Sequence, residues 1–380
     1  MTEYLNSALS QIKRSGIREF TRLAGTVEGC MFLTLGEPDF NTPDIIKEQA
    51  KADLDANITH YPPNNGQPQL LSAITEFEKR QNGYDYAPDE IIFTVGATEA
   101  LFTALFGIIN PGDEVIVPMP GYVLYEQLIK LCRGVCVPLE TSDTGFQITE
   151  ERLKSALSDK TKAIILTSPN NPTGCIYTPE TLEMMRRVLA ERKMFIICDD
   201  VYSRLVYTEN YRSFASFREF RDRLIVIQSF AKPYAMTGWR AGYLMASREV
   251  KKAFEPIHQY AVVSASSFIQ NACIKALDYD PSPMIEVYRK RRDYVLQRLE
   301  AMGLSVNRPE GAFYVFPSIA RFGMGSMAFC TRLLHEAKLA VTPGESFGAD
   351  DFFRISYSYS DEMLKEGMDR LERFVKSLEK

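Results

Sequence analysis

The chain is poor in the residues that build metal centres. It has three histidines, His60, His258 and His335, which lie far apart from one another in the sequence. None is near a pair of cysteines, and no Cys-x-x-Cys pair occurs. Because metal sites in proteins are usually built from closely spaced ligands of these types, we expect no metal site.

Disulfides and membrane segments are also not expected. The cysteines are odd in number and scattered through apolar segments, which is typical of reduced, buried residues in a cytoplasmic protein. No apolar run approaches the ~18 residues of a membrane span, and the first residues, MTEYLNSALSQIKRSG, contain no apolar core of the signal-peptide type. The seven cysteines are Cys30, Cys132, Cys136, Cys175, Cys198, Cys273 and Cys330.

The sequence also lacks an excess of positive charge. Lys and Arg number 44 and Asp and Glu 49, which gives a formal net charge of −5, and the longest uninterrupted run of Lys and Arg is only four residues, 289–292. We therefore expect no nucleic-acid partner. A chain of 380 residues suggests about two domains.

What the sequence does contain is an alternation of apolar runs and amphipathic helical stretches. This alternation predicts an α/β fold, in which a mostly parallel sheet is covered by helices on both faces to give a three-layer αβα large domain. The last hundred residues combine longer helices with short strands and predict a smaller α+β C-terminal domain. The expected sheet strands are EIIFTV (90–95), DEVIVP (113–118), TKAIILTSP (161–169), MFIICDD (194–200) and RLIVIQSF (223–230).

Four unusual polar segments follow these predicted strands. They are Gly96-Ala97-Thr98, residues 170–174 (NNPTG), residues 199–202 (DDVY) and residues 229–232 (SFAK). The carboxyl ends of parallel strands meet at one edge of a sheet, where ligands gather, so these segments are expected to converge on one cleft.

The chemistry of that cleft suggests pyridoxal phosphate. Lys232 follows a buried strand, where an amine is costly unless it is paired or used, and a lysine can form a Schiff base with the cofactor aldehyde. Asp199 is an anionic partner for a protonated ring nitrogen. A helix start with Ser229 and Arg240 nearby suits the phosphate.

At this point the sequence resembles the class I/II pyridoxal-phosphate aminotransferases, which have the aspartate aminotransferase fold (fold type I). The segments SFAK and GWRAG match the family's lysine motif and the arginine motif that follows it. The resemblance runs from SGIREF to FRISYSYS and so covers nearly the whole chain. Supporting motifs, in order, are LGEPDF, YPPNNGQPQL, TVGATEAL, SPNNPTG, CDDVY, PEGAFYVF and VTPGESFG.

The resemblance implies a role for each matching residue. Lys232 is similar to the Schiff-base lysine and proton shuttle, and Asp199 to the partner of the ring nitrogen. Tyr202 and Asn171 resemble the residues that hydrogen-bond the ring oxygen, and Tyr122 resembles the aromatic residue stacked on the ring. The phosphate would lie against Gly96, Ala97, Thr98, Ser229 and Arg240.

Further matches concern the substrate and a second chain. Arg354 resembles the arginine that binds the substrate α-carboxylate, with Gly36 and Asn171 beside it. Tyr61 is similar to a tyrosine that reaches the phosphate across the interface of a homodimer. We expect a large domain over residues 45–280, and a small domain, formed by residues 1–44 and 281–380, that closes on substrate.

The resemblance implies an enzyme of amino acid metabolism that moves an amino group between an L-amino acid and a 2-oxo acid with ping-pong kinetics. The scaffold also resembles that of carbon–sulfur β-lyases and aminocyclopropane-carboxylate synthases. The motifs quoted above do not exclude either of these enzyme classes. A regulator without catalysis is disfavoured by the intact Lys232 and by the lack of ~60 spare residues for a DNA-binding domain.

One further motif could indicate a different cofactor. The segment 323–328 (GMGSMA) fits a dinucleotide-binding pattern, which is weak alone, and we read it as a glycine-rich helix start.

The sequence leaves the amino donor open. No second arginine for a side-chain carboxylate can be identified, so aromatic, aspartate and alanine-like donors all stay open.

Overall fold

A seven-stranded sheet forms the centre of the computed structural model, which describes residues 4–12 and 16–379. The strand order is β2-β8-β7-β6-β5-β3-β4. Only β8 runs antiparallel to its neighbours, β7 and β2. The strands are β2 (Ile91–Thr94), β3 (Glu114–Met119), β4 (Val135–Glu140), β5 (Thr161–Thr167), β6 (Phe195–Asp199), β7 (Leu224–Ser229) and β8 (Gly242–Ala246).

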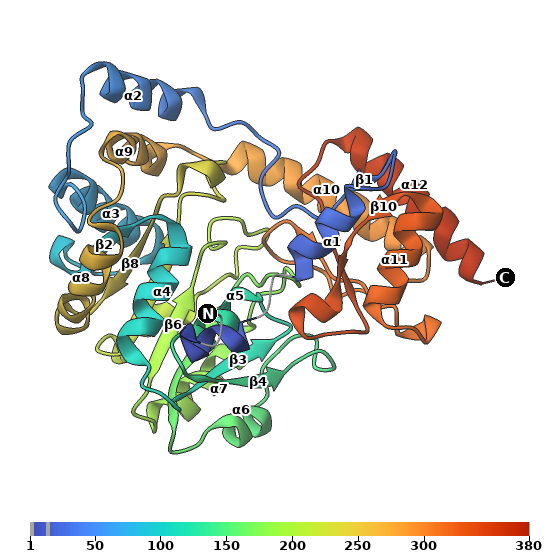
Figure 1. Ribbon diagram of the computed structural model, residues 1–380, viewed down its shortest axis with the longest axis horizontal. Helices are drawn as coiled ribbons and strands as arrows, with labels where there is room; N and C mark the ends of the chain where they lie inside the picture. The colour runs from blue at the N-terminus through green and yellow to red at the C-terminus, as the bar shows by residue number, and fades with distance from the viewer. Residues whose placement is uncertain (1–3, 13–15, 380) are drawn as a thin grey trace.

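Helices cover both faces of this sheet (Figure 1). Successive strand residues point to opposite faces, so Ile164 and Ile196 belong to one hydrophobic core, whereas Ile165 and Ile197 belong to the other. On the first face the core is closed by α2 (Asp44–Asp55), α3 (Pro68–Asn82), α6 (Glu150–Ala156), α7 (Pro179–Ala190) and α9 (Gln270–Asp278). On the second face it is closed by α4 (Gly96–Ile108), α5 (Leu124–Leu131) and α8 (Arg248–Val262).

A smaller part of the molecule, at the right of Figure 1, has its own core. The N-terminal helix α1 (Gly16–Ala24) contributes Phe20 and Ala24 to this core, beside residues from the C-terminal hundred. Its other elements are β1 (Met31–Phe32), β9 (Tyr314–Val315), β10 (Leu339–Ala340), β11 (Thr342–Pro343), β12 (Phe353–Ser356), α10 (Ser282–Ala301), α11 (Ser326–Ala337) and α12 (Asp361–Leu378).

The α/β architecture expected from the sequence is confirmed, and all five expected strands are present within two residues of their predicted ends. Two strands of the seven-stranded sheet were missed. The edge strand β4 is only partly buried and contains Pro138, so its apolar signal is weak. The segment 238–242 (GWRAG) was read as an arginine motif, and the antiparallel strand β8 begins at its last residue, Gly242.

Other expectations from the sequence have mixed outcomes. Residues 323–328 lead into α11, which begins at Ser326, so the reading as a helix start is confirmed. All seven cysteines are free, but Cys30 and Cys136 are only partly buried, which corrects the expectation that all are buried. Across the ranges 4–12 and 16–379, no three His, Cys, Asp or Glu side chains are grouped as metal ligands.

Within the same described ranges, no helix combines the length and the apolar character required to cross a bilayer.

Candidate active site

The carboxyl ends of the parallel strands open into a cavity of ≈ 780 Å³. Arg240 reaches the same edge because it lies two residues before the start of β8, which runs in the opposite direction. All the residues predicted from the sequence line this cavity except Tyr61 and Gly96, and at Gly96 an added Cβ would meet the side chain of Arg240. The predicted residues that line it are Gly36, Ala97, Thr98, Tyr122, Asn171, Asp199, Tyr202, Ser229, Lys232, Arg240 and Arg354.

Lys232 lies three residues past the end of β7, and its amine faces the cavity. Its Nζ donates a hydrogen bond to the carbonyl oxygen of Gly36 at 2.5 Å. Burial lowers the pKa of Lys232 to about 8. The nearby charge of Glu37 opposes this shift, and Arg354 and Arg240 add to it. The site therefore keeps a substantial fraction of this amine neutral near pH 8.

Asp199 ends β6 at the floor of the cavity and is only 3% exposed. Its Oδ2 accepts a hydrogen bond from the hydroxyl of Tyr125 at 2.6 Å. Its Oδ1 is buried and has no hydrogen-bond partner. Burial raises the pKa of Asp199 to about 6, and the bond from Tyr125 acts in the opposite direction. A buried acceptor without a donor is costly, so this oxygen is placed to receive a donor from a bound group.

Arg354 lies in β12 and is 3% exposed. Its Nη1 donates to Oδ1 of Asn171 at 2.8 Å, and its Nη2 donates to the carbonyl oxygen of Thr34 at 2.7 Å. The guanidinium also lies over the ring of Tyr314, 4.5 Å from its centroid. Its buried Nε has no hydrogen-bond partner. The arginine is thus held in a fixed orientation and can still bind an anion.

Two tyrosines form the wall between Arg354 and Lys232. The hydroxyls of Tyr202 and Tyr314 are 2.8 Å apart and hydrogen-bonded. The Tyr202 ring lies 5.9 Å from Lys232 Nζ. At Gly36, an added Cβ would lie 2.7 Å from the Tyr314 hydroxyl, so only glycine allows this close approach.

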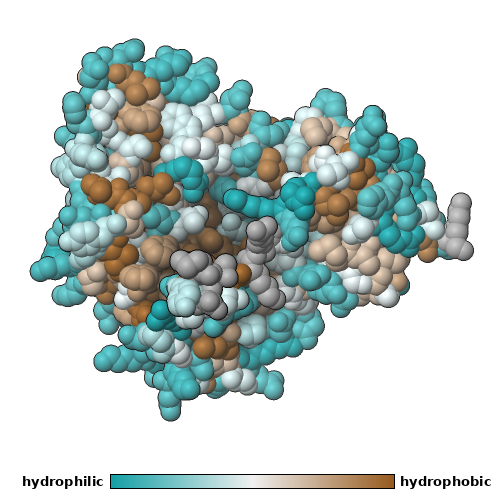
Figure 2. Space-filling model, in the orientation of Figure 1, coloured by the Kyte–Doolittle hydropathy of each residue, from teal (hydrophilic) through white to brown (hydrophobic). Residues whose placement is uncertain are grey.

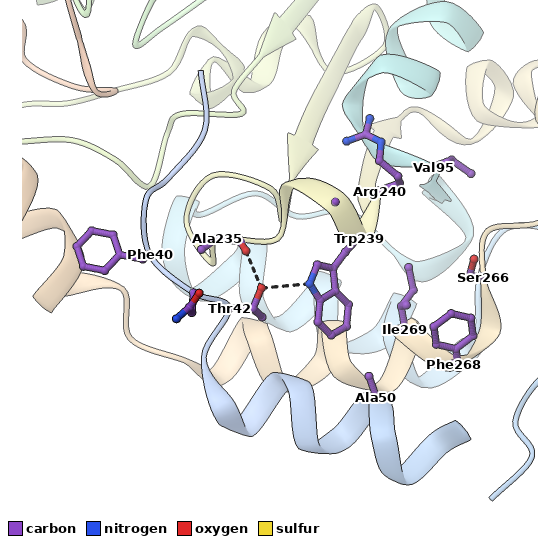
Figure 3. A pocket seen from close by; sticks show the side chains of 12 residues that line it. Phe40, Thr42, Ala50, Val95, Ala235, Trp239, Arg240, Ser266, Phe268 and Ile269 are labelled. Carbon is purple, nitrogen blue, oxygen red and sulfur yellow. Dashed lines mark hydrogen bonds between the residues drawn. The ribbon is translucent and has the colours of Figure 1, made fainter. Parts of the chain in front are cut away.

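The N-terminus of α4 and Arg240 form a second polar surface in the cavity. Gly96 begins this 13-residue helix with φ +76°, and an added Cβ would lie 2.7 Å from Nη2 of Arg240. The Arg240 side chain points away from Trp239 and toward α4 (Figure 3). A helix start offers backbone N–H groups and positive potential to an anion, and the guanidinium of Arg240 adds positively charged hydrogen-bond donors there.

These features fit pyridoxal phosphate. The unpartnered Oδ1 of Asp199 can accept a hydrogen bond from a protonated ring nitrogen, and the α4 N-terminus with Ser229 and Arg240 can hold a phosphate. Lys232, with its lowered pKa, provides the amine that the cofactor aldehyde requires.

Tyr61 lies outside this cavity. Its side chain is 86% exposed in the single chain, and it is absent from the cavity lining. Within one chain it therefore has no contact with the site, and its predicted role depends on a partner chain.

Sequence reasoning missed several residues of the site. Tyr125 and Tyr314 hydrogen-bond two of the predicted residues from 74 and 112 positions away in the sequence. Glu37 follows Gly36 in the LGEPDF motif and accepts a hydrogen bond from Thr237. Arg18, on α1, also lines the cavity. Their only sequence signal was proximity to family motifs.

A second cavity of ≈ 730 Å³ lies behind the turn that carries Lys232 (Figure 3). Trp239, the only tryptophan of the chain, forms one wall. Its Nε1 donates to Oγ1 of Thr42 at 3.1 Å, and Thr42 donates to the carbonyl oxygen of Ala235 at 2.6 Å. These bonds fix the turn between Lys232 and Arg240.

Comparisons with known proteins agree with one another. The family model described as "Aminotransferase class I and II" matches residues 28–371. A Bacillus subtilis (strain 168) protein named "Probable N-acetyl-LL-diaminopimelate aminotransferase" is 42% identical over 381 residues, 99% of this chain and 96% of that protein.

Two solved structures have the same fold. The crystal structure of aspartate aminotransferase from Thermotoga maritima matches with a TM-score of 0.94 and 37% identity, covering 98% of this chain and 100% of that one. The aspartate aminotransferase from Rhizobium meliloti gives a TM-score of 0.94 at 32% identity, covering 98% of each chain.

Proposed function

The chain belongs to the class I and II aminotransferases and is a pyridoxal-phosphate-dependent transaminase, and from this premise we propose that the cavity around Lys232 is its active site. The observation that carries the assignment is the pairing, in one cavity, of an amine of lowered pKa with a buried carboxylate oxygen that has no partner. Pyridoxal phosphate, when bound, supplies an aldehyde that condenses with amines and a ring that accepts electrons from the substrate Cα.

Lys232 is proposed as the group that moves the proton. Efficient general bases have a pKa near the working pH, and a pKa of about 8 for Lys232 meets this condition. Its Nζ can take a proton from the substrate Cα and return it at a different atom. The aromatic rings of Tyr202 and Phe313, each 5.9 Å from Nζ, limit where the amine can move.

Asp199 is proposed to hold the ring nitrogen in its protonated form through Oδ1, with Tyr125 orienting the carboxylate. Asn171 and Tyr202 are proposed to bind the ring oxygen, and Tyr122 to stack on the ring. Gly96, Ala97, Thr98, Ser229 and Arg240 are proposed to bind the phosphate.

Arg354 is proposed to bind the α-carboxylate of the substrate. A planar guanidinium can donate two parallel bonds to a carboxylate, and the contacts with Asn171 and Thr34 fix its plane. Gly36, whose carbonyl oxygen holds Lys232 Nζ, would lie beside that carboxylate.

A homodimer with Tyr61 crossing the interface is also proposed. Large side chains are exposed on the face of the large part of the molecule that carries α8 and the segment before α3: Tyr61 is 86% exposed and Tyr260 87% exposed. Apolar residues gather over the large part, at the left of Figure 2. Such surfaces on a soluble fold are typical of interfaces.

The division into a large domain, residues 45–280, and a small domain, residues 1–44 and 281–380, is a proposal supported by the separate cores. Residues 1–3, 13–15 and 380 of these ranges lie outside the described part of the chain. Arg354 belongs to the small domain, so closure of that domain on substrate would complete the site.

The free cysteines support a cytoplasmic location.

The half-reaction tests the proposal. The purified, reconstituted enzyme is mixed with single amino acids in the absence of an acceptor, and its visible spectrum is recorded. We expect the yellow cofactor colour to bleach while one equivalent of 2-oxo acid is released. Continued release of pyruvate and ammonia with the colour retained would instead indicate a carbon–sulfur β-lyase, and absence of colour after reconstitution would contradict the role of Lys232.

A further inference from the structure

His258 is a buried titratable residue that the proposed function does not use. It lies on α8, and its side chain is fully buried where this helix packs against α4. Its Nδ1 lies 2.7 Å from Oε1 of Glu99, on α4, and its Nε2 lies 2.8 Å from the carbonyl oxygen of Asn64. Both ring nitrogens are therefore engaged by groups from other parts of the chain.

These partners determine how many protons the ring and the carboxyl group hold together. A carbonyl oxygen can only accept a hydrogen bond, so Nε2 of His258 must carry a hydrogen. The contact between Nδ1 and Oε1 of Glu99 requires one further proton, on the ring or on the carboxyl group. With either assignment the two side chains together are neutral, whereas an ionised glutamate beside a neutral histidine would leave a full negative charge.

Glu99 connects this pair to the start of α4. Its Oε2 accepts a hydrogen bond from the backbone N–H of Val95 at 2.6 Å, and its Oε1 accepts one from Oγ1 of Thr103 at 3.4 Å. Val95 directly precedes Gly96, where α4 begins. The Glu99 side chain thus fixes the backbone at the helix end that is proposed to bind the phosphate.

An unbalanced carboxylate at this place would oppose phosphate binding. An acidic side chain in the first turn stabilises a helix through the helix dipole, but its negative charge also repels an anion at the same helix end. Lys251 and Glu255, earlier on α8, form an ion pair with each other. The contact that balances Glu99 is the one with His258.

We propose that His258 is a positioning residue for the cofactor phosphate, which holds Glu99 against the backbone at the start of α4 and cancels its negative charge. This inference rests on the proposed function, which places the phosphate at this helix end. It adds a residue that is outside the cavity lining and acts only through Glu99.

The test compares pyridoxine 5′-phosphate with pyridoxine, which lacks the phosphate; neither has an aldehyde. The Kd of each is measured by calorimetric titration of the cofactor-free, full-length enzyme at pH 8, and the ratio of the two values reports the phosphate interaction. We expect His258→Gln to reduce the preference for the phosphate ester by about 10-fold, because a glutamine amide cannot supply the proton and leaves Glu99 charged. His335→Gln, at an exposed position of α11, is the control and should keep the wild-type ratio.

Substitution of Glu99 separates the effect of charge from that of packing. Glu99→Gln alone should keep the preference, because its amide oxygen can still accept from Val95. The double variant Glu99→Gln/His258→Gln should regain most of the preference lost in His258→Gln, although it has one more change in the packed interior.

A purely structural role of His258 predicts the opposite order, with the double variant no better than His258→Gln. That result, an unchanged ratio in His258→Gln, or a loss in Glu99→Gln as large as that in His258→Gln would overturn the inference. A wild-type enzyme that does not prefer the phosphate ester would instead overturn the proposed placement of the phosphate.

Discussion

Asp199 shows how a single buried contact sets the properties of the site. The hydroxyl of Tyr125 donates to its Oδ2 and favours the ionised form, while burial raises the pKa to about 6. Tyr125→Phe removes this donor, so the pKa of Asp199 should rise further. The protonated acid cannot pair with a protonated ring nitrogen, and cofactor affinity should fall at a higher pH than in wild type.

The measurement is the affinity for pyridoxine 5′-phosphate between pH 5.5 and 8.5. This compound lacks the aldehyde, so it does not react with Lys232. We expect the wild-type affinity to decrease as the pH falls through about 6. The curve of affinity against pH for Tyr125→Phe should be shifted to higher pH, so that the affinity of the variant near pH 6.5 is lower by about threefold or more. Coincident curves would show that Tyr125 does not act through Asp199.

The neighbouring Asp200 predicts a pH dependence of stability. Burial raises its pKa to about 8, and the charges of Asp199 and Glu78 add to the effect. Between its ordinary value of about 3.9 and 8, the folded protein keeps a proton that the unfolded chain releases. The contribution of Asp200 to stability is therefore fully present below about pH 4 and is lost as the pH rises through 8.

Asn resembles protonated Asp and does not titrate. The thermal midpoint of the cofactor-free Asp200→Asn variant should therefore rise relative to wild type as the pH increases from 5 to 8. The free-energy difference should grow by up to about 1.4 kcal/mol per pH unit. A constant difference between the two proteins across this range would contradict the shifted pKa.

At the level of elements, the start of α4 depends on one glycine. Gly96 has φ +76°, and any side chain there would push against Arg240. Gly96→Ala should weaken binding of pyridoxal phosphate by about 10-fold or more, with a much smaller effect on pyridoxal, which has no phosphate. Both affinities are measured by equilibrium titration.

Gly83, at the C-terminus of α3, is the matched control. It has φ +68°, but an added Cβ would meet nothing within 4 Å. Gly83→Ala therefore introduces the backbone strain alone, about 1 kcal/mol, and should lower the thermal midpoint without changing the preference for the phosphate ester. If both variants lose phosphate affinity equally, the contact between Gly96 and Arg240 is not the cause.

The elements also show what sequence could and could not predict. Five apolar strands and the polar residues that follow them were predictable, because period and composition are local properties. Strand β4 was not, since it lies at an edge and is partly exposed. Tyr125 and Arg18 could not be assigned either, because their positions depend on how distant elements pack, and no local pattern distinguishes them from ordinary helix residues.

At the scale of the whole molecule, the proposed dimer places Tyr61 in the site of the partner. Tyr61→Phe should weaken cofactor binding although its side chain lies outside the cavity of its own chain. Tyr61→Phe and Lys232→Ala chains, unfolded and refolded together, should form hybrids in which one site has both residues intact. The activity of this mixture should exceed the sum of the activities of the two variants refolded separately.

A mixture no more active than its components would contradict the crossed arrangement, provided that sedimentation shows hybrid dimers. If sedimentation shows only monomers at micromolar concentration, the homodimer itself is wrong. Either result would leave the assignment of the cavity around Lys232 as the active site unchanged. It would exclude a role for Tyr61 in the site of a partner chain.

The central claim is that Lys232 is the residue that holds the cofactor, and one measurement tests it directly. The reconstituted enzyme is reduced with borohydride, which fixes the cofactor to the amine with which it has condensed, and is then digested for peptide mass analysis. We predict one added pyridoxyl phosphate group per chain, on the peptide that contains Lys232, and none on the Lys232→Ala protein. Attachment at a different lysine, or at none, would contradict the account.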